Sequence, residues 1–413
     1  MTVAAKKPAK TTTPKEAIKP KGVATSRGTS GGAKTGGAKT GGTKTGGAKT
    51  SGAKTSGEAG LRIWVLSDGT AGMRFQAVAV ADGIAAARPG TTDQPTIIED
   101  YIAPPHRLLR SLPAWGNYLS YLPFLPLFAS STKDDATPPP AIRQGSDYPD
   151  ILITCGRRMA GISIALRARA RRRGAAMQTI HIQDPRLAPS LFDALVLPSH
   201  DPTRGDNVVV MLGSLNRLTP ARIAEAAKTL PPTWLDRSSH APVAVMLGGD
   251  NGRYRITRKM VAHMAMELGK FAQMTWINDN PVRFLLVPSR RTPPELLDQL
   301  GLALGDIPYE VAPPDMANPY PGILAADAII VTADSVNMVS EAAIMGSPLL
   351  VAGWRPDDAD SCSGETGRIG LFHRAMIAGG HSAIISPYAE TEGYTALDER
   401  PRVITQLLTL LGR

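Results

Sequence analysis

Apolar residues fall into short strand-like runs that alternate with longer helical stretches from Leu61 onward. The first such unit reads LRIWVLSDGTAGMRFQAVAVADGI, in which an apolar run and a small-residue turn precede a stretch with helical spacing. The apolar positions of that stretch are Ala77, Val80, Ala81 and Ile84. Short apolar runs bounded by turn residues are typical of buried strands, and their alternation with helices predicts an α/β domain.

The same alternation continues along the rest of the chain. Further strands of the first series are expected at 150–154, 179–182, 194–197 and 207–212, with an Arg-rich helix at 162–173. The second series has expected strands at 243–247 and 283–288 and expected helices at about 257–270 and near 293–300. Pro231 and Pro232 indicate a linker between the series. We therefore predict two Rossmann-like, doubly wound domains, 61–235 and 236–413, with the ligand cleft between them.

The last unit of the second series is AADAIIVTADSVNMVSEAAIMGSPLLV, residues 325–351. It predicts a strand, a turn in which Asp334 or Ser335 caps a helix, and a second strand. Ser335, Met338 and Glu341 fall on one helical face. A carboxylate there can hold two ribose hydroxyls, and the helix start suits a pyrophosphate. The alternative is an ordinary βαβ unit, with Ser335 only a cap and Glu341 only a solvated residue.

Two further strand ends in the second domain carry residues suited to phosphate. The loop LGGDNGRYR supplies small or charged residues at Gly248, Gly249, Asn251, Gly252 and Arg253. Glycines let backbone N–H groups approach a phosphate, and arginines bind it bidentately. The next strand is followed by Ser289, Arg290 and Arg291. The alternative is that the glycines only form a turn and the Arg pair only meets surface acids.

In the first domain, the turn after the first strand contains Asp68, Gly69 and Gly72. Asp68 is the candidate general base, with Asp184 a weaker substitute. Asp68 has an alternative role as a turn residue that bonds its own backbone. Arg157 and Arg158 end another strand and can bind an anion, whereas the adjoining Cys155 is expected to be a small buried residue.

The formal net charge of +10 arises from the first 60 residues, which hold eleven Lys and one Arg against two Glu. The remaining chain is formally neutral. Repeats such as GGAKT give this segment almost no apolar side chains, so we predict a disordered basic tail at 1–60. Such a tail attracts polyanions without sequence preference, nucleic acid and anionic lipid alike, or serves only as a solubilising linker.

The N-terminus shows no apolar signal region, which favours a cytoplasmic location. Two cysteines far apart, Cys155 and Cys362, indicate neither a disulfide framework nor a metal site. Residues 106–128 combine aromatic side chains with arginines and three prolines. This segment is too polar and too often broken to span a bilayer. It either docks peripherally on lipid headgroups, placing the protein at the inner face of a membrane, or packs against the first domain.

The pattern S-x-x-M-x-x-E-A followed by G-x-P, from Ser335 to Pro348, resembles the donor-nucleotide half of GT-B glycosyltransferases. In that family the residue matching Glu341 holds the ribose. The turn DGTAGM similarly resembles the GGTGGH loop of the lipid-linked peptidoglycan N-acetylglucosaminyltransferase. This chain has Met73 at the position of that loop's histidine, and methionine cannot accept a proton. The departure counts against ordinary inverting transfer.

Eight segments also resemble a narrower family, the plant mitochondrial-fission proteins named for an elongated-mitochondria phenotype and their bacterial relatives. These segments are LSDGTAGMRFQA, CGRRMA, IQDPR, LGSLNRLTP, LGGDNGRYR, PSRRTPP, NPYPGILAADAIIVTADSVNMVSEAA and GRIGLFH. The resemblance implies a GT-B-like fold and, for the plant members, recruitment of dynamin-related proteins. The sequence therefore leaves two functions open: a nucleotide-sugar-dependent glycosyltransferase without a further cofactor, or a scaffold that has lost transfer activity.

Overall fold

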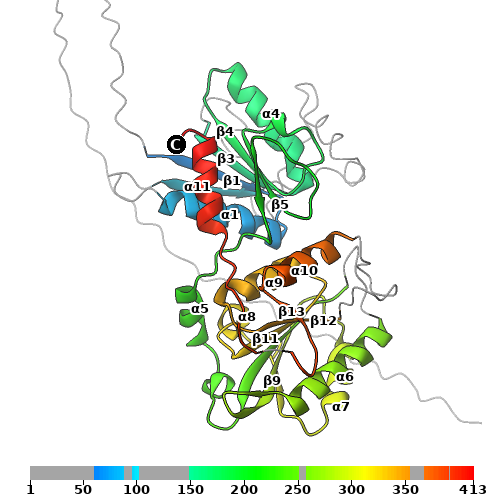
Figure 1. Cartoon of the computed structure of the whole chain (residues 1–413). Coiled ribbons are helices and arrows are strands. Elements are labelled where there is room, and N and C mark those ends of the chain that lie inside the picture. Colours follow the sequence, from blue (N-terminus) through cyan, green and yellow to red (C-terminus); the bar gives the residue numbers. More distant parts are fainter. Residues whose placement is uncertain (1–59, 88–94, 102–147, 251–256, 354–366, 390) are drawn as a thin grey trace, which may run out of the picture. The chain divides into compact units, whose positions relative to one another are not determined.

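A computed structural model describes residues 60–87, 95–101, 148–250, 257–353, 367–389 and 391–413. These residues form two successive parallel sheets with flanking helices (Figure 1). The predicted α/β class, with two doubly wound parallel sheets, is confirmed. The predicted tail, the segment 106–128 and the loop residues Asn251, Gly252 and Arg253 lie outside the described residues.

The first sheet has the strand order β2-β1-β3-β4-β5-β6, with every described pair parallel. Its strands are β1 (Arg62–Ser67), β2 (Thr96–Tyr101), β3 (Ile151–Cys155), β4 (Gln178–Ile182), β5 (Ala194–Pro198) and β6 (Val208–Met211). The chain leaves β1 on one side to form β2 and returns on the other side to form β3. The gap between the carboxyl ends of β1 and β3 is therefore a topological switch point, where ligands of doubly wound sheets bind.

The second sheet has the order β10-β9-β7-β11-β12-β13, and β8 pairs antiparallel with β9. Its strands are β7 (Ala241–Leu247), β8 (Trp276–Ile277), β9 (Asn280–Pro288), β10 (Tyr309–Val311), β11 (Ala328–Thr332), β12 (Leu349–Ala352) and β13 (Ala383–Ile384). In the parallel register, Ile329 of β11 lies opposite Ala244 of β7 and Leu349 of β12. The switch point of this sheet lies between β7 and β11.

The helices cover the sheets with their apolar faces. They are α1 (Ala71–Ala86), α4 (Arg157–Arg172), α5 (Pro220–Ala227), α6 (Arg258–Met274), α7 (Pro294–Leu304), α8 (Tyr320–Ile323), α9 (Val336–Ala342), α10 (Arg368–Ala378) and α11 (Arg400–Leu410). Single 3-10 turns occur at Pro189–Leu191, Pro232–Leu235 and Ala343–Met345. The expected helix at 162–173 in fact starts at Arg157, because the polar pair Arg157 and Arg158 forms its first turn.

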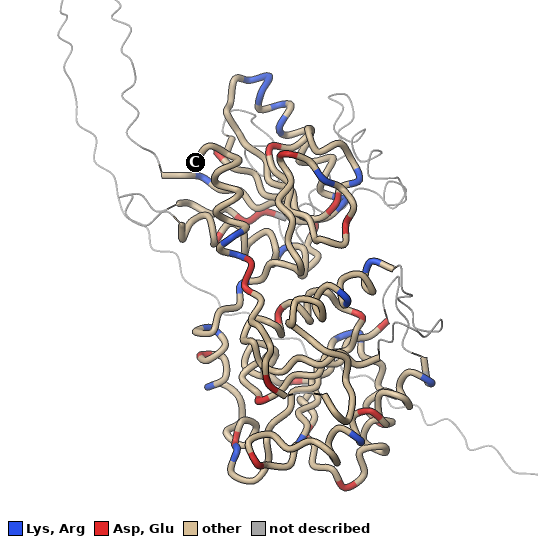
Figure 2. The backbone as a smooth tube through the Cα atoms, viewed as in Figure 1, with Lys and Arg blue, Asp and Glu red and all other residues tan. Residues whose placement is uncertain are grey.

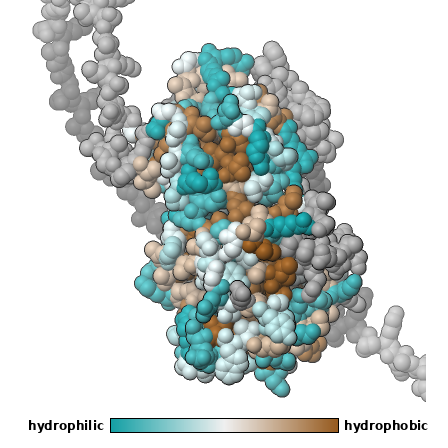
Figure 3. All heavy atoms as spheres, viewed as in Figure 1, coloured by the Kyte–Doolittle hydropathy of each residue, from teal (hydrophilic) through white to brown (hydrophobic). Residues whose placement is uncertain are grey.

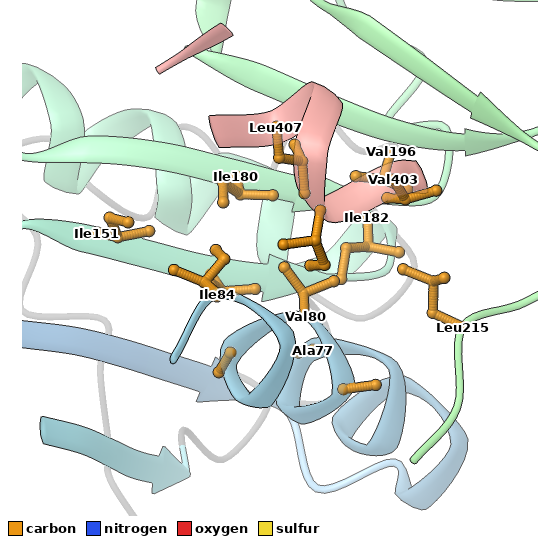
Figure 4. Close-up of a cluster of buried hydrophobic side chains, with 14 of the residues drawn as sticks. Ala77, Val80, Ile84, Ile151, Ile180, Ile182, Val196, Leu215, Val403 and Leu407 are labelled. Carbon is orange, nitrogen blue, oxygen red and sulfur yellow. The ribbon is translucent and has the colours of Figure 1, made fainter. Parts of the chain in front are cut away.

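The C-terminal helix α11 packs on the first core rather than the second. Val403, Ile404 and Leu407 are buried together with α1 and the strands of the first sheet. Figure 4 shows Val403 and Leu407 beside Ile180, Ile182 and Val196, opposite the apolar face of α1. The side chain of Ile404 lies so close to Gly83 that a Cβ there would be 2.6 Å from it.

Residues just before the predicted boundary pack in the opposite direction. Ile223, Leu230 and Trp234 belong to the core of the second sheet, although they precede residue 236. The chain therefore crosses between the two cores twice, once before β7 and once before α11. A division at 235 follows the order of the strands, but it does not follow the packing of α5 and α11.

Charges of both signs are distributed along both sets of elements, and basic positions recur along α4 (Figure 2). On the face shown in Figure 3, hydrophobic areas alternate with hydrophilic ones. Within the described ranges, no helix has the length and apolar character needed to cross a bilayer.

Candidate functional site

A cavity of about 540 Å³ opens at the carboxyl ends of four strands of the first sheet. Residues that follow β1, β3, β4 and β5 line it, namely Asp68, Thr70, Gly156, Arg157, Arg158, Gln183, Asp184, His200 and Asp201. It therefore includes the switch point between β1 and β3. The opposite wall comes from Val336 and Asn337 in α9 and from Arg368 and Ile369 in α10.

Three helices of at least eleven residues begin at this cavity. Their first residues or N-caps line it: Thr70 for α1, Arg157 for α4 and Arg368 for α10. None of the three N-caps provides a side-chain hydrogen bond to the first turn. Helix N-termini concentrate N–H donors and partial positive charge, so their convergence favours an anion.

Arginines and carboxylates alternate around the cavity wall. Arg158 Nη1 lies 3.7 Å from Asp68 Oδ2, and Arg368 Nη1 lies 2.7 Å from Asp201 Oδ1. A second guanidinium nitrogen of Arg368 is 3.9 Å from Asp184 Oδ2. The wall thus holds cations suited to phosphate beside carboxylates that can accept a proton or hydroxyl hydrogen bonds.

Asp68 forms the turn after β1 and also faces the cavity. Its Oδ1 accepts a 3.0 Å hydrogen bond from the Thr70 N–H, as a turn-forming aspartate does. The side chain nevertheless lines the cavity and is 10% exposed. Gly69 has a φ of 78° in this turn, and its N–H donates to Ser67 Oγ. The turn bond therefore orients Asp68 without removing it from the cavity.

Met73 also lines the cavity, and it packs against sulfur and backbone rather than charge. Cys155 Sγ lies 3.6 Å from Met73 Sδ, and a Cβ on Gly156 would lie 3.4 Å from the same sulfur. Burial, followed by the negative charge of Asp68, raises the pKa of the Cys155 thiol far above its usual range. Cys155 therefore remains a neutral, buried thiol, and no proton acceptor stands at position 73.

The loop after β4 carries unusual backbone conformations at the cavity. Gln183 and Arg186 have φ values of 73° and 55°, in the left-handed region that non-glycine residues seldom adopt. Between them, Asp184 Oδ1 accepts hydrogen bonds from the Arg186 N–H and the Thr203 hydroxyl. Strained residues of this kind cluster at binding sites, where surrounding contacts hold them in place.

The switch point of the second sheet holds a separate polar cluster around Asp334. The Gly249 N–H donates to Asp334 Oδ2, and Arg291 Nη2 lies 3.0 Å from the same oxygen. The Gly248 N–H donates instead to the Thr332 hydroxyl, at 2.7 Å. Burial raises the pKa of Asp334, although hydrogen bonds from the Thr332 hydroxyl and the Gly249 N–H, together with the charge of Arg291, oppose the shift. The two glycine amides expected to face a diphosphate are thus already paired within the chain.

Ser335 is the N-cap of α9, accepting from the Met338 N–H at 3.4 Å, and Asp334 is not. Glu341 lies one turn after Met338 and is partly buried, and the Tyr320 hydroxyl that approaches its carboxyl donates to Met338 O at 3.4 Å. Burial raises the pKa of Glu341 to about 7, and the bond from Tyr320 limits the rise. Glu341 is neither the freely solvated residue of the simpler alternative nor part of the cavity wall.

The cavity therefore brings together only some of the residues predicted from the sequence. Asp68 lines it directly, and Gly69 and Gly72 belong to the same turn and helix start. The described residues Gly248, Gly249, Ser289, Arg290, Arg291, Ser335, Met338 and Glu341 do not line it. Ser289 instead contacts Thr292. Their ligand-binding roles remain predictions.

Sequence reasoning did not single out Gln76, His200, Asp201, Asn337 or Arg368, all of which line the cavity. A signal for three of them was present, because Gln76, Asn337 and Arg368 lie within the family-like segments. Six of those eight segments contribute to the cavity, and LGGDNGRYR and PSRRTPP contribute none of their described residues.

The described titratable residues give no indication of a metal centre. Among them, no group of three His, Cys, Asp or Glu side chains is placed to hold an ion. His181 is fully buried, stacks on Phe192 and contacts the Thr154 hydroxyl through Nδ1. Burial lowers the pKa of His181 to about 3, so it is a neutral residue of the core.

Comparison with known proteins identifies a family over most of the chain. The family model described as "Mitochondrial fission ELM1" matches residues 71–411. An uncharacterized protein of Rickettsia prowazekii, RP120, is 26% identical over 334 residues, which cover 70% of this chain and 83% of that protein. The mitochondrial fission protein ELM1 of Arabidopsis thaliana is 30% identical over 245 residues, 52% of this chain and 53% of the plant protein.

Solved structures similar to this chain include MurG and UDP-N-acetylglucosamine 2-epimerases. MurG of Acinetobacter baumannii matches with a TM-score of 0.41 and 15% identity, over 85% of this chain and 92% of its own. The UDP-GlcNAc 2-epimerase of Neisseria meningitidis, bound to UDP-GlcNAc, matches with a TM-score of 0.46 and 13% identity, over 84% and 92%. Likenesses of this degree do not extend to activity.

Proposed function

The chain belongs to the mitochondrial fission ELM1 family, and from that premise we propose that it binds a nucleotide sugar in the cavity of the first sheet. We further propose that it transfers the sugar, with Asp68 as the general base. The observation that supports this most directly is the convergence of three helix starts and three arginines, Arg157, Arg158 and Arg368, on one cavity at strand ends.

The proposed diphosphate position follows from charge. The helix starts and the arginines offer N–H donors and positive charge to a developing leaving group. No metal ion is needed for that neutralisation. Residues of the second switch point, including Arg290 and Arg291, and the ribose role of Glu341 remain proposals for the rest of the donor.

The proposed chemical step uses Asp68. In a transfer reaction the acceptor hydroxyl loses a proton as it attacks the sugar carbon and the nucleoside diphosphate leaves. Asp68 lies in the cavity wall, its Oδ1 is held by the Thr70 N–H, and its Oδ2 is 3.7 Å from Arg158. The remaining lone pairs of that carboxylate suit it to accept the proton.

Calorimetric titration tests binding. UDP, GDP and CMP and their sugar conjugates are titrated into wild type, Arg158→Ala and Arg172→Ala. Both arginines lie on α4, but only Arg158 lines the cavity. We expect Arg158→Ala to weaken binding by about 1 kcal/mol, roughly fivefold, because Arg158 is half exposed. Arg172→Ala is expected to bind like wild type. Absence of binding by every ligand at millimolar concentration would rule out the proposal.

A second candidate function is a scaffold on the same fold without transfer activity. Met73 favours the scaffold. It packs against Cys155 and occupies the position where the glycosyltransferase loop that this turn resembles has a proton-accepting histidine. The Arabidopsis relative, named a mitochondrial fission protein, favours it as well. Turnover of nucleotide sugars, including slow hydrolysis, separates the two. Turnover that Asp68→Asn abolishes supports the enzyme, and its complete absence with intact nucleotide binding supports the scaffold.

Location at the inner face of a membrane is proposed from residues 106–128 and the basic tail, on sequence grounds. The test is co-sedimentation with anionic vesicles at low and high salt. We expect a chain lacking residues 1–57 to lose the salt-sensitive part of binding only. A chain in which the aromatic residues of 106–128 are replaced by serine is expected to lose the salt-resistant part. Full-length protein that stays in the supernatant at low salt would contradict membrane contact.

A further inference from the structure

One buried amide in the cavity wall has a hydrogen-bonding group that the chain does not satisfy. Gln76, in the second turn of α1, lines the cavity and is 2% exposed. Within the part of the chain that the structure describes, its Oε1 has no hydrogen-bond partner. Leaving such a buried acceptor unpaired is costly, and natural proteins seldom do so without a functional reason.

The other end of the same amide is engaged. Gln76 Nε2 donates to Asn337 Oδ1 at 3.3 Å, across the cavity wall between α1 and α9. Gly72, one turn before Gln76, permits this arrangement, because a Cβ there would lie 2.7 Å from Asn337 Nδ2. The Asn337 contact therefore fixes the direction of the Gln76 amide and leaves its carbonyl oxygen as an acceptor only.

We propose that Gln76 is a specificity-determining residue, whose carbonyl accepts a hydrogen bond from a hydroxyl or N–H group of the bound ligand. This inference rests on the proposed nucleotide-sugar function and narrows it. A phosphate or carboxylate ionised at neutral pH has no hydrogen to donate, so the anion at the helix starts does not satisfy Gln76. The ligand must also present a neutral donor, either a hydroxyl of the sugar or ribose or an N–H of the base.

Sites that read a ligand hydrogen bond through a buried polar group discriminate strongly against ligands that lack the donor. Gln76 thus selects a glycosylated or nucleoside-bearing ligand over bare diphosphate. Asn337 acts as its positioning residue, holding the amide in one orientation across the cavity.

The test compares ligands as well as variants. The probes are UDP-glucose, GDP-mannose, their parent nucleoside diphosphates and inorganic pyrophosphate, titrated into the full chain. Gln76→Met removes the amide at nearly constant volume, and Gln76→Glu keeps an oxygen acceptor. Gln178→Met is the matched control, because Gln178 also bridges two elements, to Leu411 O and Arg413 Nε, but does not line the cavity.

The measured quantity is the ratio of nucleotide-sugar affinity to pyrophosphate affinity, which a general loss of folding or of positive charge does not change. We expect Gln76→Met to lower this ratio about tenfold, corresponding to one good hydrogen bond at about 1.4 kcal/mol per factor of ten. Gln178→Met is expected to keep the wild-type ratio, and Gln76→Glu, which keeps an acceptor but cannot donate to Asn337 Oδ1, is expected to lie between wild type and Gln76→Met. A loss seen with sugar conjugates alone assigns the donor to the sugar, and a loss shared by the parent nucleotides assigns it to the nucleoside.

Two results overturn the assignment of Gln76. One is a wild-type ratio in Gln76→Met, and the other is an equal loss in Gln178→Met. Wild type that binds pyrophosphate but no nucleotide or nucleotide sugar overturns the proposed function itself. The failures of the two proposals are thus separable.

Discussion

Arg368 Nη1 lies 2.7 Å from Asp201 Oδ1, joining the first turn of α10 to the loop after β5. The Asp201 side chain is 5% exposed, and that of Arg368 is 25% exposed. A charge so deeply buried is stabilised only while its partner is present. This ion pair therefore links the two walls of the cavity.

Replacement of Arg368 by methionine is expected to destabilise the fold by about 2 to 4 kcal/mol, because it leaves Asp201 buried without its counter-charge. Urea denaturation measures the change. The double variant Arg368→Met with Asp201→Asn should recover part of the loss. Lys228→Ala breaks an exposed ion pair with Glu225 and should change stability by less than about 0.5 kcal/mol. If Arg368→Met and Lys228→Ala changed the free energy of unfolding equally, the ion pair of Arg368 with Asp201 would have no structural role.

The return of α11 to the first core gives a second prediction. Leu407 is fully buried among residues of the first sheet, whereas Leu410 on the same helix is 39% exposed. Leu407→Ala should cost about 2 to 5 kcal/mol through lost burial and the cavity left behind. Leu410→Ala should cost less than about 0.5 kcal/mol in the same denaturation measurement. A similar cost at both positions would mean that α11 does not pack as described.

Strands buried on both faces were the elements most accurately predicted from the sequence. Ala328–Thr332 matches β11, because a continuous apolar run is what a central parallel strand requires. The edge strands β2 and β10 were not predicted, since half-exposed segments such as TIIEDY lack that run. The local sequence pattern also could not predict which core α11 packs against. An amphipathic helix shows that it packs, but its spacing does not say on which of two cores.

The candidate site was predicted in part for a related reason. Residues that directly follow parallel strands meet at one edge of the sheet, and this rule correctly predicted that Asp68, Arg157 and Arg158 lie close together. The same rule placed Gly248 and Gly249 at the switch point of the second sheet. There, however, the Gly248 N–H donates to Thr332 and the Gly249 N–H donates to Asp334. Whether a backbone donor is still available depends on side chains more than eighty residues away, and no local motif encodes that.

The close approach at Gly248 gives a third prediction. A Cβ at this position would lie 1.9 Å from Asp334 Oδ1, so Gly248→Ala should displace the buried carboxylate and cost about 2 to 3 kcal/mol. Gly269, inside α6, is the control, because the nearest atom to a Cβ there is 3.9 Å away. Gly269→Ala should stabilise the helix by about 0.5 to 1 kcal/mol. Thermal or urea unfolding compares the two. A tolerated Gly248→Ala would contradict the tight Asp334 cluster.

The partly buried carboxyl of Glu341 predicts a pH dependence of stability. Burial raises the pKa of Glu341 from an ordinary 4.5 to about 7 in the folded chain. Between these values the folded state binds more protons than the unfolded state, so the free energy of unfolding falls as pH rises. The contribution of the protonated Glu341 carboxyl to the free energy of unfolding is fully present below about pH 4.5 and is lost as pH rises through about 7. The upper limit of this contribution is about 3 to 4 kcal/mol, at about 1.4 kcal/mol per pKa unit over a rise from 4.5 to about 7.

Glu341→Gln mimics the protonated carboxyl and does not titrate, so the variant should lack this slope. Urea denaturation from pH 5 to pH 8 should show the variant gaining on wild type as pH rises, while Glu225→Gln at an exposed site follows wild type. If Glu341 also holds the ribose as proposed, Glu341→Gln should weaken nucleotide binding by about 1.5 to 3 kcal/mol, and the loss should disappear for a 2′,3′-dideoxy nucleotide. Equal affinity of wild type and variant for the ordinary nucleotide would refute the ribose role, in keeping with the absence of Glu341 from the cavity wall. Parallel pH profiles of wild type and Glu341→Gln would show that the carboxyl is ionised and solvated in the folded chain.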